Sequence, residues 1–250
     1  FADNIMVGHL GTSQFAGVGF ANMVFTVGFV FCTCFTQGMI PHIGQSYGKD
    51  EHGNVAKFFT NGLLLDAFIC ALVMVLMFCI MPLMDHMGQD PQILGYAKEY
   101  YRIMVWSMAP CIMFYVIRAL TEGVGNTSYT MFITIICNIL NIFLNWVLIY
   151  GHLGFEAMGV SGAAMATFIS RVAMMIIGTV ILLSGKIYKR YLPEIRPSAL
   201  EMGKIKVLAK TSFPIGFQGL VEVTAFSLAG IMVGWFGKEA MAAHQAANTI

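Results

Sequence analysis

Long apolar runs separated by short polar connectors make up nearly the whole chain. A helix that crosses a bilayer needs about 20 mostly apolar residues. After a truncated helix that ends near Gly8, such runs lie at about 14–40, 58–84, 100–122, 128–150, 160–184 and 208–236. The pattern predicts an all-α polytopic membrane protein.

Composition supports this class and excludes others. Hydrophobic residues make up 58% of the chain and charged residues 11%, whereas soluble domains carry about 25% charged residues. The partner of this surface is therefore the lipid bilayer, and a net charge of +1 gives no support for a nucleic-acid partner. The sequence has no Gly-rich phosphate loop, no nucleophile motif and no histidines at metal spacing, so we predict neither an enzyme nor a bound cofactor.

The cysteines lie within the apolar runs rather than in paired positions in loops. A disulfide framework or a zinc site requires the paired arrangement. We therefore interpret all six as small buried hydrophobic residues: Cys32, Cys34, Cys70, Cys79, Cys111 and Cys137.

The basic residues predict the orientation, because Lys and Arg accumulate in cytoplasmic loops. Seven of the 14 basic residues fall within 186–210, so that segment is predicted to be cytoplasmic. Counting back through alternating helices also puts Lys49, Lys57 and Arg118 on the inside. The connectors 85–97 and 151–159 then fall outside, and neither contains a Lys or Arg. We predict a multi-pass protein of the plasma (inner) membrane with a cytoplasmic loop at 186–207.

An internal repeat links the two ends of the chain. Ile5–Gly8 recurs as Ile231–Gly234, an offset of 226. The same offset aligns four further identical residues: Gly11, Ala16, Ala21 and Asn22. Six helices separate the copies, so both copies face the same way, as in transporters built from parallel repeats. The alternative is that helix ends rich in small residues simply resemble one another.

Two acids in the apolar runs are candidates for function, because a buried charge costs about 2.5–3.5 kcal/mol on insertion scales. The repeat counterpart of Asp3 is Ala229, so the helix can be built without this acid. A buried carboxyl can bind Na⁺ or carry a proton. Glu222 follows Pro214, which removes a backbone donor and is expected to kink the helix and provide polar backbone near the acid.

Other polar residues have weaker claims. For Asp66 and Arg171 a structural role is at least as plausible as a transport role. Asn138, Asn141 and Asn145 are spaced three and four apart, so they share one helical face, which is expected to point into the bundle. Their amides could bind a carboxylate or its protonated form; bonding between helices is the alternative. Thr167 lies among small residues that allow close approach of helices.

These residues resemble the multidrug and toxic compound extrusion (MATE) family, in its NorM-like branch. The resemblance covers the whole chain, from the end of helix 1 to helix 7. It rests on five segments in order: Asp3–Gly8, Pro41–Gly48, Asn138–Asn145, Gly159–Thr167 and Phe213–Glu222.

The resemblance implies twelve helices in two six-helix bundles, and export of organic cations in exchange for H⁺ or Na⁺. Asp3 would be the amino-lobe coupling acid, networked with Asn141, Asn145 and Thr167. Glu222 would be the carboxyl-lobe acid, and either acid could hold Na⁺. An Asp at the position of Asn145 marks another branch, which is why the NorM-like branch is favoured.

We therefore expect three regions: an amino-terminal bundle at 1–185, a basic cytoplasmic linker at 186–207, and the first helix of the second bundle at 208–250. The predicted function is secondary active antiport of organic cations or drugs by a monomer. A flippase for lipid-linked precursors, a related two-bundle fold, is the alternative, but its cavity would be strongly basic. The substrate and the choice between H⁺ and Na⁺ stay open.

Overall fold

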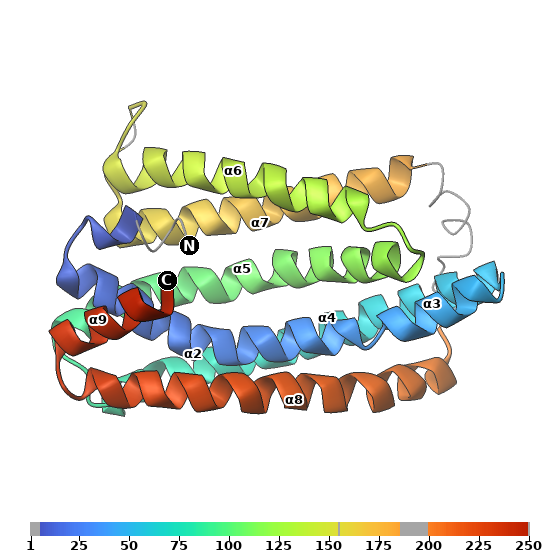
Figure 1. Ribbon diagram of the computed structural model, residues 1–250, viewed down its shortest axis with the longest axis horizontal. Coiled ribbons are helices and arrows are strands. Elements are labelled where there is room, and N and C mark those ends of the chain that lie inside the picture. Colours follow the sequence, from blue (N-terminus) through green and yellow to red (C-terminus); the bar gives the residue numbers. More distant parts are fainter. Residues whose placement is uncertain (1–5, 155, 186–199, 250) are drawn as a thin grey trace.

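The computed structural model describes residues 6–154, 156–185 and 200–249 as a bundle of long helices (Figure 1). Six helical spans among these residues are long and apolar enough to cross a membrane. The helices are α2 (Thr12–Gln37), α3 (Ile40–Gly48), α4 (His52–Ile80), α5 (Pro91–Gly123), α6 (Ser128–Tyr150), α7 (Gly159–Ser184), α8 (Met202–Gly234) and α9 (Lys238–Thr249), with a 3₁₀ turn, η1, at Met81–His86.

Successive long helices run antiparallel, and the bundle has two chemically different ends. In Figure 1, α6 and α7 form one side, α8 forms the opposite side, and α2, α4 and α5 lie between them. Lys49, Lys57, Arg118 and Lys204 all lie at the end where α3 finishes and α8 begins. By the distribution of basic residues this is the cytoplasmic end.

Several helices begin earlier than the apolar runs predicted. The run at 58–84 begins at His52, the run at 100–122 begins at Pro91 inside the predicted connector, and the run at 208–236 begins at Met202 inside the predicted linker. The added turns are polar and extend the helices beyond the apolar window, where hydropathy carries no signal. At the start of α5 the side chain of Asp90 accepts a hydrogen bond from the backbone of Gln92 (2.8 Å) and caps the helix.

The predicted run at 14–40 is two helices. It ends as α2 at Gln37, and α3 continues from Ile40. Gly38, at the break, lies against α8: a Cβ there would be 2.3 Å from the hydroxyl oxygen of Ser212. The break therefore coincides with a close contact between helices that only glycine permits.

The described part of the sequence repeat, from Val7 to Phe15 and from Val233 to Met241, has a similar backbone in both copies. Gly11 and Gly237 both have positive φ (147° and 102°), and each precedes a helix, α2 at Thr12 and α9 at Lys238. The same backbone bonds recur at the offset of 226. They join Leu10 to Val7 and Phe15 to Gly11 in the first copy, and Phe236 to Val233 and Met241 to Gly237 in the second. The range 208–250 therefore contains a second helix, α9, that the hydropathy pattern did not predict.

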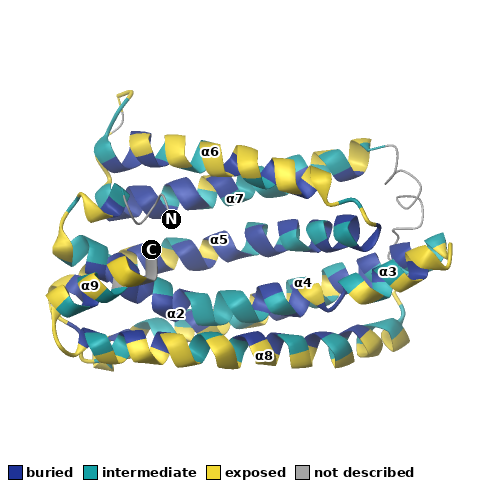
Figure 2. Cartoon of the chain, in the orientation of Figure 1, coloured by how far each residue is buried: buried dark blue, intermediate teal, exposed yellow. Residues whose placement is uncertain are grey.

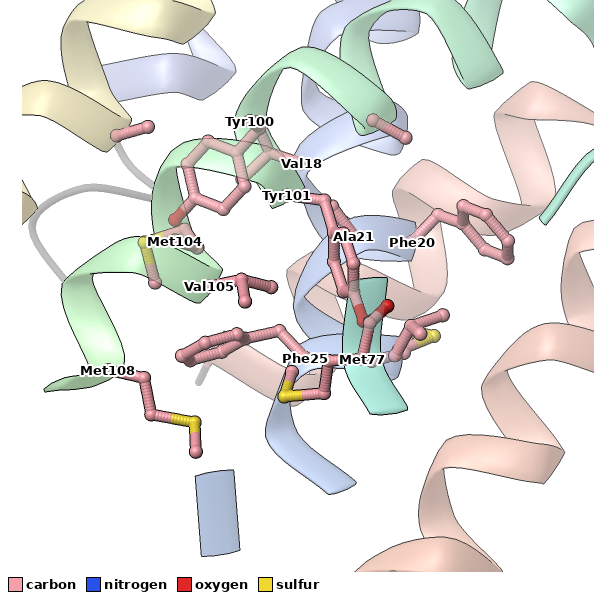
Figure 3. Close-up of a cluster of buried hydrophobic side chains, with 14 of the residues drawn as sticks. Val18, Phe20, Ala21, Phe25, Met77, Tyr100, Tyr101, Met104, Val105 and Met108 are labelled. Atoms are coloured by element: carbon pink, nitrogen blue, oxygen red, sulfur yellow. The ribbon is translucent and has the colours of Figure 1, made fainter. Parts of the chain in front are cut away.

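The largest buried cluster lies where α2, α4 and α5 meet (Figure 3). Phe25 of α2 and Tyr101 of α5 fill its centre, and the Tyr101 hydroxyl donates to the carbonyl of Met77 on α4 (3.1 Å). The outer faces of α6 and α8 are largely exposed (Figure 2) although they carry large apolar residues such as Ile139 and Phe226. Such faces suit contact with lipid.

All six cysteines are free. Four are buried, Cys34 is half-buried and Cys79 is exposed, so the prediction of six buried cysteines is wrong for the last one. Its helix α4 turns one face outward at this level, and an apolar thiol is compatible with lipid. No group of three or more potential metal ligands occurs among the described residues.

Candidate functional site

A chain of polar side chains joins α6 to α7 within the bundle. The amide nitrogen of Asn141 lies 3.4 Å from the hydroxyl oxygen of Thr167. One helical turn further along α6, the amide nitrogen of Asn145 donates to the amide oxygen of Asn141 (3.2 Å). Asn145 is fully buried and Thr167 nearly so. The structure thus brings together three of the predicted site residues from two helices.

Small residues allow the two helices to come this close. Gly162 of α7 lies against the end of α6, where a Cβ would be 2.6 Å from the carbonyl oxygen of Leu148. Thr167 is stabilised in turn by a hydrogen bond from its hydroxyl to the carbonyl of Ala163 (3.1 Å). The pairing of α6 and α7 therefore fixes both the spacing and the orientation of the polar chain.

The predicted asparagine face is only partly internal. Asn141 and Asn145 point into the bundle, but Asn138 is exposed. It lies on the same face, about one turn nearer the cytoplasmic end than Asn141 and about two turns nearer than Asn145, where no described residue covers it. The polar site therefore occupies the outer half of α6.

Asp3 lies outside the described residues. The described residues that follow it begin at Met6 and are fixed to α6, because the hydroxyl of Tyr150 donates to the carbonyl of Met6 (3.0 Å). Val7 is fully buried. The tyrosine contact was missed in the sequence because a single aromatic residue at a helix end gives no specific signal.

Glu222 lies on α8, away from the amide chain, and is exposed. Among the described residues its charge is close enough to interact with Cys34 of α2. The expectation of polar backbone beside Glu222 is wrong. The assigned helix α8 continues through Pro214, and the carbonyl that proline leaves without its usual donor belongs to Lys210. That carbonyl is twelve residues, or about 18 Å, from Glu222 along the helix.

Arg171 lies near the middle of α7 and contacts two other helices, α5 and α2. Its guanidinium donates to the hydroxyl of Ser107 on α5 (2.6 Å). It also lies over the rings of Phe29 (4.8 Å) and Phe25 (5.4 Å) of α2. This environment of a hydroxyl and two aromatic faces stabilises a half-buried cation. None of these partners was predicted, because Phe and Ser are too frequent here to indicate a contact.

Asp66 lies at the middle of α4, is only 4% exposed, and has a carboxyl oxygen within hydrogen-bonding distance (2.9 Å) of the hydroxyl oxygen of Thr36 on α2. On the α5 side of Thr36 a cavity of about 250 Å³ extends to Arg118 and Glu122. These two form an ion pair (2.6 Å) at a spacing of four residues, a signal that the sequence does contain.

Polar contacts also join α4 to the segment before α8 at the cytoplasmic end. The ammonium of Lys57 bonds a carboxylate oxygen of Glu201 (2.6 Å), and the backbone nitrogen of Glu201 donates to Asn61 (3.0 Å). The hydrogen bond and charge of Lys57 hold the pKa of Glu201 below its usual value.

The fold and the polar chain together define a polytopic α-helical membrane protein with a hydrogen-bonding site inside its bundle. The MatE family model matches residues 1–147, and the chain belongs to this family. Members of the family are transporters rather than enzymes. The multi-pass plasma-membrane localisation predicted from the sequence agrees with this family.

Curated relatives match nearly the whole chain. The chain is 27% identical over 242 residues to the probable multidrug resistance protein NorM of Agrobacterium fabrum, covering 97% of the chain and 52% of that protein. It is 29% identical to the protein of the same name from Rhizobium meliloti, covering 97% and 52%. The chain therefore spans about half the length of the curated relatives it matches.

Solved structures have the same fold. An inward-facing multidrug resistance MATE family transporter of the MOP superfamily superposes with a TM-score of 0.82 at 20% identity, covering 98% of this chain and 55% of that chain. The eukaryotic MATE transporter AtDTX14 also has a TM-score of 0.82, at 16% identity, covering 93% and 51%. These comparisons confirm the MATE-like all-α fold.

Proposed function

We propose that this chain is part of a secondary active antiporter that exports drugs or other small organic cations in exchange for H⁺ or Na⁺. The observation that carries the proposal is the chain from Asn145 through Asn141 to Thr167. Amides and hydroxyls both donate and accept hydrogen bonds, so this chain can rearrange its donors when a nearby acid gains or loses a charge. The curated relatives named as multidrug resistance proteins support transport of drugs.

In this proposal Asp3 is the coupling acid, and the amide chain forms hydrogen bonds with it. It precedes the buried Val7 by four positions in the sequence, and Tyr150 fixes the intervening Met6 to α6. Binding of a proton or Na⁺ at Asp3 would change which groups of Asn141 and Asn145 donate to it. That change would alter the packing of the first helix against α6 and α7.

Glu222 has a separate role in the proposal. It is exposed on α8 among the described residues, remote from the amide chain. There it would attract the cationic substrate or hold the coupling ion in the second bundle. We propose the division 1–185, 186–207 and 208–250 for the two bundles and their linker, and a monomer as the transporting unit.

Room for an apolar substrate exists between α2, α4 and α8. A cavity of about 400 Å³ there is lined mainly by apolar side chains, including Met23, Phe31, Met77 and Phe217. Methionine side chains repack easily around differently shaped molecules. This lining suits flat organic cations better than the pyrophosphate of a lipid-linked precursor, so the flippase alternative has no specific observation in its favour.

Efflux of a fluorescent cationic dye from proteoliposomes tests the proposal. The full-length protein is reconstituted, and a ΔpH or a Na⁺ gradient is imposed separately. One gradient should drive uphill dye efflux in the wild type, and Asp3→Asn should abolish it while the protein remains folded. Asn138→Ala, at the exposed position of the same asparagine series, should transport normally. Efflux by Asp3→Asn at the wild-type rate would contradict the mechanism, and no gradient-driven efflux in the wild type would contradict the function.

A further inference from the structure

When Asp66 is ionised, the single hydroxyl hydrogen of Thr36 faces two acceptor oxygens. The hydroxyl oxygen of Thr36 lies 2.9 Å from the carbonyl oxygen of Cys32 and 2.9 Å from a carboxyl oxygen of Asp66. A hydroxyl has one hydrogen to donate, and a carbonyl can only accept. Both contacts are made at full strength only when Asp66 supplies the second hydrogen.

Burial favours the same protonation state. Asp66 is 4% exposed and Thr36 is 2% exposed, and this hydroxyl is the hydrogen-bonding partner of the carboxyl among the described residues. An ionised carboxylate needs a positive partner or several donors to be stable away from water. A neutral acid that donates one hydrogen bond has no such requirement.

The groups that face Asp66 do not supply a positive charge. The titratable neighbours of Asp66 are Cys32 of α2 and Cys70 of α4 itself. Cys111 of α5 lies next to Cys70, farther from Asp66. Thiols are neutral in a buried apolar setting. Asp66 is therefore not held in its ionised form by these neighbours.

Arg118, Lys204 and His42, which lie on helices packed against α4, each have other partners. Arg118 of α5 pairs with Glu122, and Lys204 of α8 lies near Glu201 (3.9 Å). His42 of α3 contacts the hydroxyl of Thr211 (2.9 Å) and stacks on a phenyl ring. Within the part of the chain that the structure describes, no cation forms an ion pair with Asp66.

Thr36 also connects Asp66 to a route toward the cytoplasmic end. It lines the cavity of about 250 Å³, and the other polar residues that line this cavity are Thr33, Gln37, Tyr115, Arg118 and Glu122. These walls are hydrogen-bonding groups of α2 and α5, and the cavity is large enough to hold several waters. The hydroxyl of Thr36 therefore lies between Asp66 and a polar cavity.

We propose that Asp66 is a second proton-binding site of this chain, protonated in this conformation and exchanging its proton through the Thr36 cavity. On release, the O–H bond of Asp66 breaks and the proton passes to cavity water. The hydroxyl hydrogen of Thr36 then turns from the Cys32 carbonyl to the new carboxylate. Thr36 is a positioning residue: its hydrogen bond to the backbone of α2 is present when Asp66 is neutral and is lost when Asp66 is ionised. Proton binding at Asp66 does not depend on the proposed antiport. Only the coupling of this proton to transport rests on that function.

Infrared spectroscopy of the full-length protein in lipid tests the protonation state without any transport. At neutral pH the wild type should show the carbonyl band of a protonated carboxylic acid, and Asp66→Asn should lose that component. Asp50→Asn, at a carboxyl in a polar turn, is the matched control and should keep it. Persistence of the full band in Asp66→Asn, or its absence in the wild type, would overturn the proposal.

Asp66→Asn should fold, because an amide nitrogen can donate to Thr36 as the protonated acid does. Thr36→Val provides a second measurement that leaves Asp66 in place: the band should shift in frequency because its acceptor is gone, whereas Thr36→Ser should leave it unchanged. An unshifted band in Thr36→Val would also overturn the assignment.

Dye efflux separates this proposal from the antiport itself. If the wild type pumps dye with ΔpH, Asp66→Asn should lose uphill efflux and keep downhill movement of dye. Unchanged ΔpH-driven efflux in Asp66→Asn would refute the coupling role of Asp66. A wild type that shows the infrared band but no gradient-driven efflux would refute the antiport and leave the proton site standing.

Discussion

Gly162 of α7 lies directly against the backbone of Leu148 at the outer end of α6, where a Cβ would be 2.6 Å from the Leu148 carbonyl oxygen. This contact sets the distance between the two helices that carry Asn141, Asn145 and Thr167. Backbone cannot move aside as the end of a flexible side chain can. The geometry of the polar site therefore depends on a glycine that makes no polar contact itself.

Gly162→Ala should push the two helices apart and destabilise the protein by about 1–3 kcal/mol, the usual cost of overpacking. Thermal unfolding of the full-length protein in detergent would measure this cost. Gly95→Ala is the matched control, because no atom lies within 4 Å of a Cβ at that position of α5. A Gly162→Ala protein as stable as this control would show that α6 and α7 can separate freely.

Thr167→Val should weaken the polar chain while preserving its shape. Valine has no hydroxyl, so the amide nitrogen of Asn141 loses the acceptor at 3.4 Å. A fully buried donor left without a partner costs about 1–3 kcal/mol, so the half-buried amide of Asn141 should lose less than that. The orientation of Asn145 is also no longer fixed through Asn141. We expect reduced gradient-driven dye efflux in proteoliposomes. Thr167→Ser keeps the hydroxyl and should retain efflux, so equal loss in both variants would assign the residue a packing role only.

Much of the fold could be predicted from the sequence because its driving force is local. Apolar runs of membrane length mark spanning helices wherever they occur, and the repeat at an offset of 226 correctly related the turn at Gly11 to the turn at Gly237. Helix ends were predicted less well. The polar first turns of α5 and α8 lie outside the apolar window, and the break at Gly38 depends on a neighbouring helix.

The site could be predicted only where its partners are close in sequence. Asn141 and Asn145 are one turn apart, so the helical period alone puts them together. The hydrogen bond between Thr36 and Asp66 joins residues 30 positions apart. It depends on the axial register in which α2 and α4 pack. The same holds for Arg171, whose aromatic partners are on α2. No single-sequence pattern encodes those helix registers.

Arg171→Lys should destabilise the protein although it keeps the charge. The planar guanidinium lies over the rings of Phe29 and Phe25 and donates to Ser107, and an ammonium cannot reproduce this combination. A desolvated cation–π contact contributes about 2 kcal/mol. Thermal unfolding should therefore show a lower midpoint for Arg171→Lys than for Ser107→Ala, which removes one hydrogen bond. Equal midpoints for Arg171→Lys and the wild type would show that only the charge matters.

The salt bridge between Lys57 and Glu201 should depend on pH. Lys57 lowers the pKa of Glu201 through its hydrogen bond. A carboxyl whose pKa is lower in the folded state stabilises that state above its ordinary pKa, and the stabilisation is lost as the pH falls through the lowered value. We therefore expect the contact between α4 and the start of α8 to be intact at neutral pH and to loosen below the ordinary range of glutamate.

Hydrogen exchange of the backbone in 200–206, corrected for the intrinsic effect of pH, would measure this. At neutral pH Glu201→Gln should exchange faster than the wild type, and the difference should vanish once acid protonates Glu201 in the wild type. The effect should be small and should shrink in high salt, because both partners are partly exposed. Glu239→Gln, the same change near the start of α9, should leave exchange in 200–206 unaltered at every pH. A difference between Glu201→Gln and the wild type that persists in acid would mean that the substitution acts through packing rather than through the charge of the carboxylate.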